Sequence, residues 1–413
     1  MPARTPPRWV TVPRLADVEE RWATHPTRRA LVTVAAIAVA AELVLAARIY
    51  AHGYGADNDT WLMLGTWDVL VDRHRYVASR PPGYLLAEVA IGALAEVGGH
   101  WLSNGASVGL GVATLVLLHR LVRRRTGTVD AALLVAVMAV TPAFVAAATT
   151  SIDYLYGLCF FLAGWWALER GSPTPLAAVL LGVGGAARLT YAPLGLVVLL
   201  AGPGRSRPRS ERVAGALVVA VTTAVAYVLP WRAAGGLEFL SPDRPTAQGV
   251  LGIAGRALFK GGDLLGLAGS LTAVVAVVLA LRSRGRGERW LLALLAVQLA
   301  LWGWLPAEPS YLLPGLAAVL VWLARPHVGP ATRWALVTLA ATLVAYAFVD
   351  VRLVEIDHVN RYGYDTCAPT EATGARWRPH VRRGPLLDHP AMSDALRACN
   401  ERQRAAMSTR AAP

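Results

Sequence analysis

Long apolar runs alternate with short polar segments along almost the whole chain. About 20 mostly apolar residues in a helix are enough to cross the hydrocarbon core of a bilayer. Some stretches, such as 176–187 and 264–281, carry no charged residue at all. The pattern predicts an all-α polytopic membrane protein with about eleven transmembrane helices, over residues 31–50, 101–119, 129–148, 152–168, 174–187, 190–202, 213–231, 263–281, 290–305, 311–324 and 334–350.

One further apolar stretch, 83–97, has a different character. Glu88 and Glu96 interrupt it, and Pro81-Pro82 precedes it. About fifteen residues are too few to cross a bilayer comfortably. We expect an interfacial or re-entrant helix on the outer face.

Arginine clusters between the runs indicate the orientation. If the N-terminus is cytoplasmic and the spans alternate, each tight cluster falls inside, as the positive-inside rule requires; the inside segments are 1–30, 120–128, 169–173, 203–212, 282–289 and 325–333. The C-terminus is then extracytoplasmic. The expected organisation is a cytoplasmic segment (1–30), a transmembrane domain (31–350) whose outer loop covers 51–100, and a short outer tail (351–413).

Composition agrees with the membrane class. The chain is 55% hydrophobic and only 16% charged, whereas soluble proteins carry about 25% charged residues. The net charge of +13 does not indicate nucleic-acid binding, because the basic residues act as topology signals between spans. Lys260 is the only lysine, and such arginine-rich usage indicates a GC-rich, actinobacterial-like genome and a bacterial cell membrane.

The three cysteines fall into two groups. Cys159 lies within an apolar run and is most simply a small core residue. Cys367 and Cys399 lie in the tail. An extracytoplasmic tail permits a disulfide between them, but sequence alone does not supply the geometry, and the pairing stays open.

Two carboxylates, Asp57 and Asp59, follow the first predicted span, three and five residues after Tyr54. Their oxygens suit a divalent cation such as Mg²⁺ or Mn²⁺. One of them could instead act as general base on an acceptor hydroxyl. The simpler alternative is a helix N-cap before Thr60.

Other ionisable and aromatic residues also fall on the predicted outer side. Arginine forks suit phosphate oxygens, although the first-loop arginines could equally contact lipid headgroups or pair with Asp68 and Asp72. An outer aspartate could simply cap the next helix, and a lone arginine between apolar runs pairs with a carboxylate or a phosphate. The further candidates are Arg75, Arg80, Tyr84, Asp153, Arg188, Glu308 and Tyr311.

Taken in order, these groups resemble the GT-C class of integral-membrane glycosyltransferases, which includes protein O-mannosyltransferases and aminoarabinose transferases. The resemblance covers residues ~30–325 and rests on the acidic outer loop, the Ser79–Tyr84 turn, the Arg120–Arg125 cluster, Asp153, the stretch 182–190 and Tyr311–Pro314. The chain departs from the class in its Asp-Asn-Asp acidic group, which leaves the base undecided. It also lacks the large soluble C-terminal domain of some members.

The resemblance implies inverting transfer of a hexose or pentose from a polyprenyl-phosphate-linked donor to an acceptor glycan, lipid or protein outside the cell membrane. Asp57 or Asp59 would deprotonate the acceptor. Arg80 and Arg188 would hold the donor phosphate, and Asp153 would orient an arginine or the sugar. The helix at 83–97 would border a groove for the lipid chain.

A transporter or flippase for a lipid-linked glycan is the main alternative, because buried charges and many spans serve it equally well. Transporters usually show inverted repeats and charges near the bilayer midplane, and neither is evident here. A non-catalytic scaffold leaves the outer charges unexplained. An O-antigen ligase or polymerase would carry a large outer loop late in the chain. The sequence contains no P-loop or other ATP-binding motif.

Overall fold

The computed structural model describes residues 26–55, 57–236, 240, 249–282, 289–304, 308–324, 328–359 and 371–410. Helices dominate these residues. The main helices are α2 (Pro26–Ala51), α3 (Asn58–Arg73), α4 (Leu85–Arg123), α5 (Thr128–Ala139), α6 (Pro142–Thr149), α7 (Tyr154–Glu169), α8 (Thr174–Ala187), α9 (Tyr191–Leu200), α10 (Arg209–Ala226), α11 (Val228–Ala233), α12 (Gly249–Arg282), α13 (Arg289–Trp304), α14 (Leu313–Leu323), α15 (Pro330–Phe348) and α16 (Asp394–Arg410). Short 3-10 helices are η1 (Pro203–Ser206), η4 (Pro309–Leu312) and η5 (Pro390–Met392).

Three helices in the described residues are long and apolar enough to cross a membrane: α4, the part Ala257–Leu281 of α12, and α15. The pair α5–α6 adds a fourth if it is one span. Shorter apolar helices are Thr174–Ala187, Arg289–Trp304 and Pro309–Leu323. The all-helical polytopic membrane class is therefore confirmed. The number of about eleven spans and the orientation of the termini stay predictions.

The predicted span 129–148 is not one straight helix. It consists of α5 and α6, which are bent by 69° relative to each other. Pro142 is the first residue of α6, and a proline disfavours helical geometry in the residue before it. The bend follows directly from this proline.

Helix α4 changes direction at two glycines. Gly98 and Gly99 have non-helical backbone angles, with φ of −141° and 60°. The break divides α4 into a part over 85–97 and a longer part over 100–123. The expected separate helix at 83–97 is present as the first part, which packs against α3 where Gly92 meets Trp67. Its place at a membrane interface stays a prediction.

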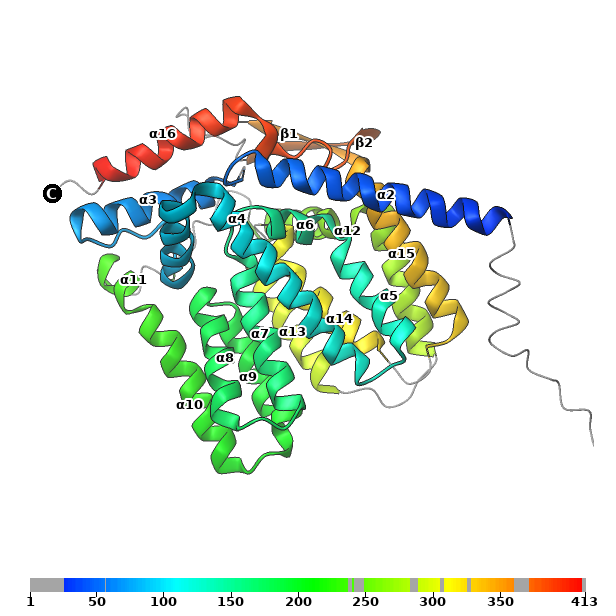
Figure 1. Ribbon diagram of the computed structural model, residues 1–413, viewed down its shortest axis with the longest axis horizontal. Helices are drawn as coiled ribbons and strands as arrows, with labels where there is room; N and C mark the ends of the chain where they lie inside the picture. Colours follow the sequence, from blue (N-terminus) through cyan, green and yellow to red (C-terminus); the bar gives the residue numbers. More distant parts are fainter. Residues whose placement is uncertain are drawn as a thin grey trace, which may run out of the picture.

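Several elements lie together across one end of the helix bundle: α2, α3, α16 and the β-hairpin (Figure 1, top). The hairpin pairs β1 (Val349–Val359) antiparallel with β2 (Glu371–Arg383). We refer to α3, α16 and the hairpin as the end layer. The described part of the tail expected over 351–413 contains most of this hairpin and α16; the hairpin was not predicted.

Close packing of helices through glycine predicts a stability effect. A methyl group on Gly164 of α7 would lie 2.6 Å from Leu181 Cγ and 3.0 Å from the Ala177 carbonyl oxygen of α8. Small residues at such crossings let helices in membranes approach closely. We expect Gly164→Ala to lower the free energy of unfolding by ~1–3 kcal/mol, measured by thermal unfolding in detergent.

The matched control is Gly109→Ala on α4, where an added methyl group would meet no atom within 4 Å. This control gains the helix propensity of alanine without a clash and should not lose stability. Equal unfolding temperatures for the two variants would contradict the packing argument.

Candidate functional site

Asp153 occupies a fully buried position between α6 and α7, at the N-cap of α7. Its side chain makes no capping hydrogen bond. Instead its Oδ1 atom accepts hydrogen bonds from Arg80 Nη2 and Arg188 Nη1, each at 3.1 Å. A single carboxylate oxygen thus joins two guanidinium groups from distant parts of the chain.

Arg80 extends this arrangement to the first outer loop. Its Nη1 atom lies 2.8 Å from Asp59 Oδ2, in the first turn of α3. Asp59, Arg80, Asp153 and Arg188 therefore form one continuous series of ion pairs, which we call the ion-pair chain. Its members come from α3, the loop before α4, the α6–α7 link and the C-cap of α8.

A tight turn positions Arg80. The Gly83 N–H donates to the Arg80 carbonyl oxygen at 2.6 Å, and Gly83 adopts a positive φ of 85°, which glycine tolerates without strain. A side chain at this position would also collide with Tyr76 Oη and Pro230. The Ser79–Tyr84 turn thereby fixes where the guanidinium enters the site.

Three tyrosine rings surround the Arg188 guanidinium. The ring centroids of Tyr311, Tyr154 and Tyr84 lie 4.3, 4.4 and 5.3 Å from its Cζ atom. Arg188 is only 3% exposed. Cation–π contacts of this kind hold a desolvated guanidinium in place, so its position is fixed before any ligand arrives.

Some buried polar atoms at the ion-pair chain have no hydrogen-bond partner within the part of the chain that is described. They are Arg80 Nε, Tyr154 Oη and Asp153 Oδ2. Buried polar groups are nearly always paired, and each exception requires an explanation. Two potential donors and one acceptor here suit a bound molecule with oxygen acceptors and a hydroxyl group.

Asp57 is the N-cap of α3, since its Oδ1 atom accepts the Asp59 backbone N–H at 3.0 Å. The capping alternative considered from the sequence is therefore realised, but capping engages only one carboxylate oxygen. Burial, followed by the negative charges of Asp59 and Glu308, raises the pKa of Asp57 to about 8, against the lowering effect of Arg80. A carboxyl group whose pKa lies near neutral pH is suited to general base catalysis, because its ionised form accepts a proton readily.

Lys260 is a site residue that the sequence interpretation missed. Its Nζ atom on α12 lies 3.5 Å from Glu308 Oε1, and Glu308 precedes Tyr311 by one turn of η4. The signal was available, because Lys260 is the only lysine of the chain. The wider cluster holds three cations and four carboxylates, a formal balance of −1 (3 − 4), counted as Arg80, Arg188 and Lys260 against Asp57, Asp59, Asp153 and Glu308.

Two sequence candidates lie outside this cluster. The Tyr54 ring packs edge-on against Trp61, with centroids 5.5 Å apart, and lines a separate cavity between α3 and α16. Arg75 is exposed beyond the end of α3. Asp68, considered as a partner for the first-loop arginines, instead binds Arg404 of α16.

A divalent cation at Asp57 and Asp59 fits the geometry poorly. Asp59 is already held by Arg80, and Asp57 caps α3. The described residues contain no group of three or more His, Cys, Asp or Glu side chains able to hold a metal ion. We derive no chemical step through a metal, and metal dependence stays a prediction.

Cys159 is not a member of the ion-pair chain. Cys159 is buried with a free thiol. The pairing of Cys367 with Cys399, which the sequence leaves open, is not tested, because Cys367 lies outside the described residues.

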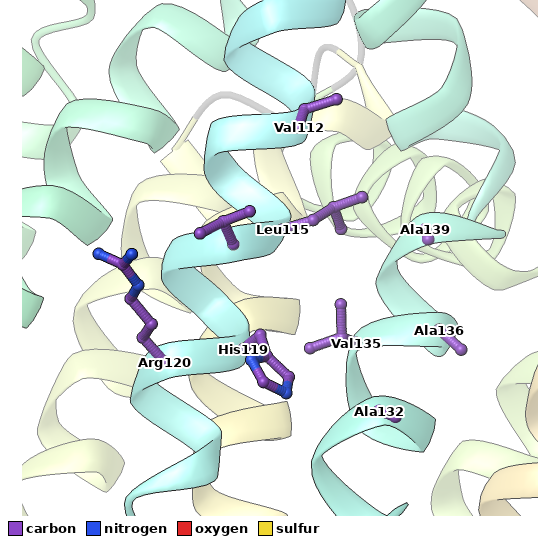
Figure 2. Close-up of a pocket in the computed structure, with 9 residues that line it drawn as sticks. Val112, Leu115, His119, Arg120, Ala132, Val135, Ala136 and Ala139 are labelled. Carbon is purple, nitrogen blue, oxygen red and sulfur yellow. The ribbon is translucent and has the colours of Figure 1, made fainter. Parts of the chain in front are cut away.

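An apolar groove runs between the later part of α4 and α5 (Figure 2). It has a volume of about 460 Å³ and is lined by Val112, Leu115, Val116, His119, Arg120, Ala132, Val135, Ala136 and Ala139. The Arg120 side chain points away from α5 in this view and stacks on Trp166. The groove does not border 83–97, so the lipid groove expected beside that helix stays a prediction.

The sequence matches no known family model and no curated protein. The fold, however, resembles that of ArnT from Cupriavidus metallidurans. The apo structure aligns with a TM-score of 0.50 at 15% identity, over 77% of this chain and 63% of ArnT. A second ArnT structure, bound to undecaprenyl phosphate, aligns with a TM-score of 0.41 at 14% identity, over 76% and 59%.

This chain thus spans about three fifths of the length of the ArnT chains. At such low identity the likeness concerns the fold alone. The likeness of this chain to ArnT in fold agrees with the polytopic helical membrane architecture expected from the sequence.

Proposed function

We propose that this protein is a membrane glycosyltransferase that moves a sugar from a polyprenyl-phosphate-linked donor to an acceptor on the extracytoplasmic face, with inversion at the anomeric carbon. The observation that carries the proposal is the ion-pair chain, in which two buried guanidinium groups share one oxygen of Asp153. The unpaired Arg80 Nε and Tyr154 Oη atoms beside it are suited to phosphate oxygens. The ArnT-like fold supports the GT-C class.

The reaction is a single displacement. The acceptor hydroxyl oxygen attacks the anomeric carbon and its proton passes to a carboxylate. The bond from that carbon to the phosphate oxygen breaks as the new bond forms, and its electron pair leaves with the polyprenyl phosphate. Arg80 and Arg188 stabilise the charge that develops on this leaving group.

We assign the role of base to Asp57. Asp59 is engaged by Arg80 at 2.8 Å, whereas only one oxygen of Asp57 is used in capping α3. The high proton affinity of Asp57 also matches that role, since the best catalytic pKa lies near the working pH. Asp153 holds the two arginines in place rather than contacting the acceptor.

The location of the cluster favours a transferase over a transporter or flippase. The four residues of its ion-pair chain come from the ends of α3, α7 and α8 and from the loop before α4. Transporter sites lie near the bilayer midplane, at discontinuous helices related by a repeat. A reaction site at helix ends, beneath an end layer, suits an acceptor that arrives from outside.

Binding of undecaprenyl phosphate and of undecaprenol, the same chain without phosphate, tests the proposal in nanodiscs. We expect at least about tenfold tighter binding of the phosphate, since tenfold corresponds to ~1.4 kcal/mol and each charge-assisted hydrogen bond contributes that much or more. Equal affinity for the two lipids would contradict a phosphate site at the ion-pair chain.

A further inference from the structure

A separate cavity of about 410 Å³, lined by both apolar and charged side chains, lies between α3 and α16 of the end layer. Its lining residues are Tyr54, Trp61, Asp68, Glu401, Arg404 and Ala405. The volume is within the range of small-molecule sites. The helices α3 and α16 pack directly against each other and lie side by side in the end layer (Figure 1).

Fixed contacts build the walls of this cavity. Arg404 donates from Nε and Nη2 to the two carboxylate oxygens of Asp68, at 2.7 and 2.8 Å. Trp61 is 4% exposed and donates from Nε1 to the Gly55 carbonyl oxygen at 3.0 Å. Gly65 lets α16 approach, because a methyl group there would lie 2.8 Å from Met407 Cγ. The cavity is therefore a preformed part of the α3–α16 interface.

Two aromatic residues of the cavity lie close in sequence to the proposed base. Tyr54 and Trp61 flank Asp57, three residues before it and four residues after it. The Tyr54 carbonyl oxygen accepts the Ser151 N–H at 2.8 Å, two residues before Asp153. The aromatic end of the cavity is thus tied to both the base and the ion-pair chain.

The lining has the chemistry of a sugar-binding site. Aromatic rings pack against the apolar faces of sugar rings, while planar carboxylate and guanidinium groups bind neighbouring hydroxyls. The charged residues Asp68, Glu401 and Arg404 sum to −1 (1 − 2). This charge disfavours a phosphate-bearing acceptor and favours neutral hydroxyl groups.

We infer that the cavity between α3 and α16 is the acceptor subsite and binds a neutral glycan whose hydroxyl group is presented to Asp57. The inference rests on the proposed function for its role. The helix α16 then supplies acceptor recognition.

The test is saturation-transfer difference NMR on the full chain in detergent, with the methyl glycosides of mannose, galactose, glucose and arabinose as probes and no donor present. We expect wild type to bind at least one probe. Ala405→Phe, which fills the cavity, should reduce its signal at least about fivefold. Ala395→Phe is the control, because Ala395 is exposed on the same helix and does not line the cavity.

Glu401→Gln provides a second variant that keeps the size of the side chain and should also weaken the signal. Equal signals from wild type and Ala405→Phe, or no signal from wild type with any probe, would overturn the inference. Binding of undecaprenyl phosphate, measured on the same samples, should be the same in all variants. If wild type does not bind undecaprenyl phosphate, this result would count against the proposed function but not against sugar binding in the cavity.

Discussion

Replacing Asp57 by asparagine is expected to lower sugar transfer by ~10²–10⁴-fold, the usual contribution of a general base. Asparagine caps helices as well as aspartate does, so the Asp57→Asn variant keeps the bond to the Asp59 N–H. The substitution therefore separates the two interpretations of this residue. A cap alone predicts unchanged transfer, whereas a base predicts its loss.

The same variant has a pH signature. With Asp57 as base, wild-type kcat/KM should rise with pH and level off above about 8, because the surrounding Asp59 and Glu308 charges and burial raise the pKa of Asp57, with Arg80 opposing them. The Asp57→Asn variant should show no such rise. Asp72→Asn, at an exposed acid near the end of α3, is the matched control and should retain the wild-type profile.

Stability should change in the same pH range. The pKa of Asp57 is higher in the folded state, about 8, than its ordinary value of 3.8. Its protonation therefore contributes stability that is fully present at pH values below 3.8 and is lost as pH rises to about 8. The difference in unfolding temperature, Asp57→Asn minus wild type, should therefore increase from pH 6 to pH 8. An unchanged transfer rate, or a difference in unfolding temperature that does not depend on pH, would remove Asp57 from the mechanism.

Replacing Arg188 by lysine is expected to lower transfer by ~10²–10³-fold, as found when one charge-stabilising donor is removed from an active site. Lysine keeps the positive charge opposite Asp153 and should preserve the fold. It does not reproduce the planar fork that reaches Asp153 while stacking among Tyr84, Tyr154 and Tyr311. The loss should appear as a lower kcat, measured with a polyprenyl-phosphate-linked sugar as donor.

Arg120→Lys is the control for this substitution. Arg120 also stacks on an aromatic ring, that of Trp166, with 4.9 Å between its Cζ atom and the ring centroid. It lies in the last turn of α4, whereas Arg80 of the ion-pair chain precedes the first turn of that helix. Transfer by this variant should equal that of wild type. Comparable losses from Arg188→Lys and Arg120→Lys would mean that Arg188 acts only through general stability.

Much of the helical framework is predictable from the sequence. The apolar runs at 174–187 and 290–305 correspond to α8 and α13 within one residue, because apolar composition and length determine where such helices form. The bend within 129–148 could have been predicted from Pro142, because a proline disfavours helical geometry in the residue before it. The β-hairpin at 349–383 was missed because the tail was interpreted by its polarity and not by its alternation.

The site was predictable in its members but not in its connections. Asp59, Arg80, Asp153 and Arg188 each stood out as ionisable residues beside apolar runs. Their pairing spans up to 73 residues of sequence for Arg80 with Asp153, and no local pattern encodes such contacts. Arg75 was selected by the same reasoning and lies outside the cluster, because proximity in sequence does not place a side chain.

The most direct test follows a polyprenyl-phosphate donor with a radiolabelled sugar in proteoliposomes that contain the purified protein and an acceptor glycan. The account predicts that the label leaves the lipid and appears on the acceptor, with an equal amount of polyprenyl phosphate released. Movement of intact labelled donor between the leaflets, with no sugar transferred to any acceptor, would contradict it and identify a flippase instead.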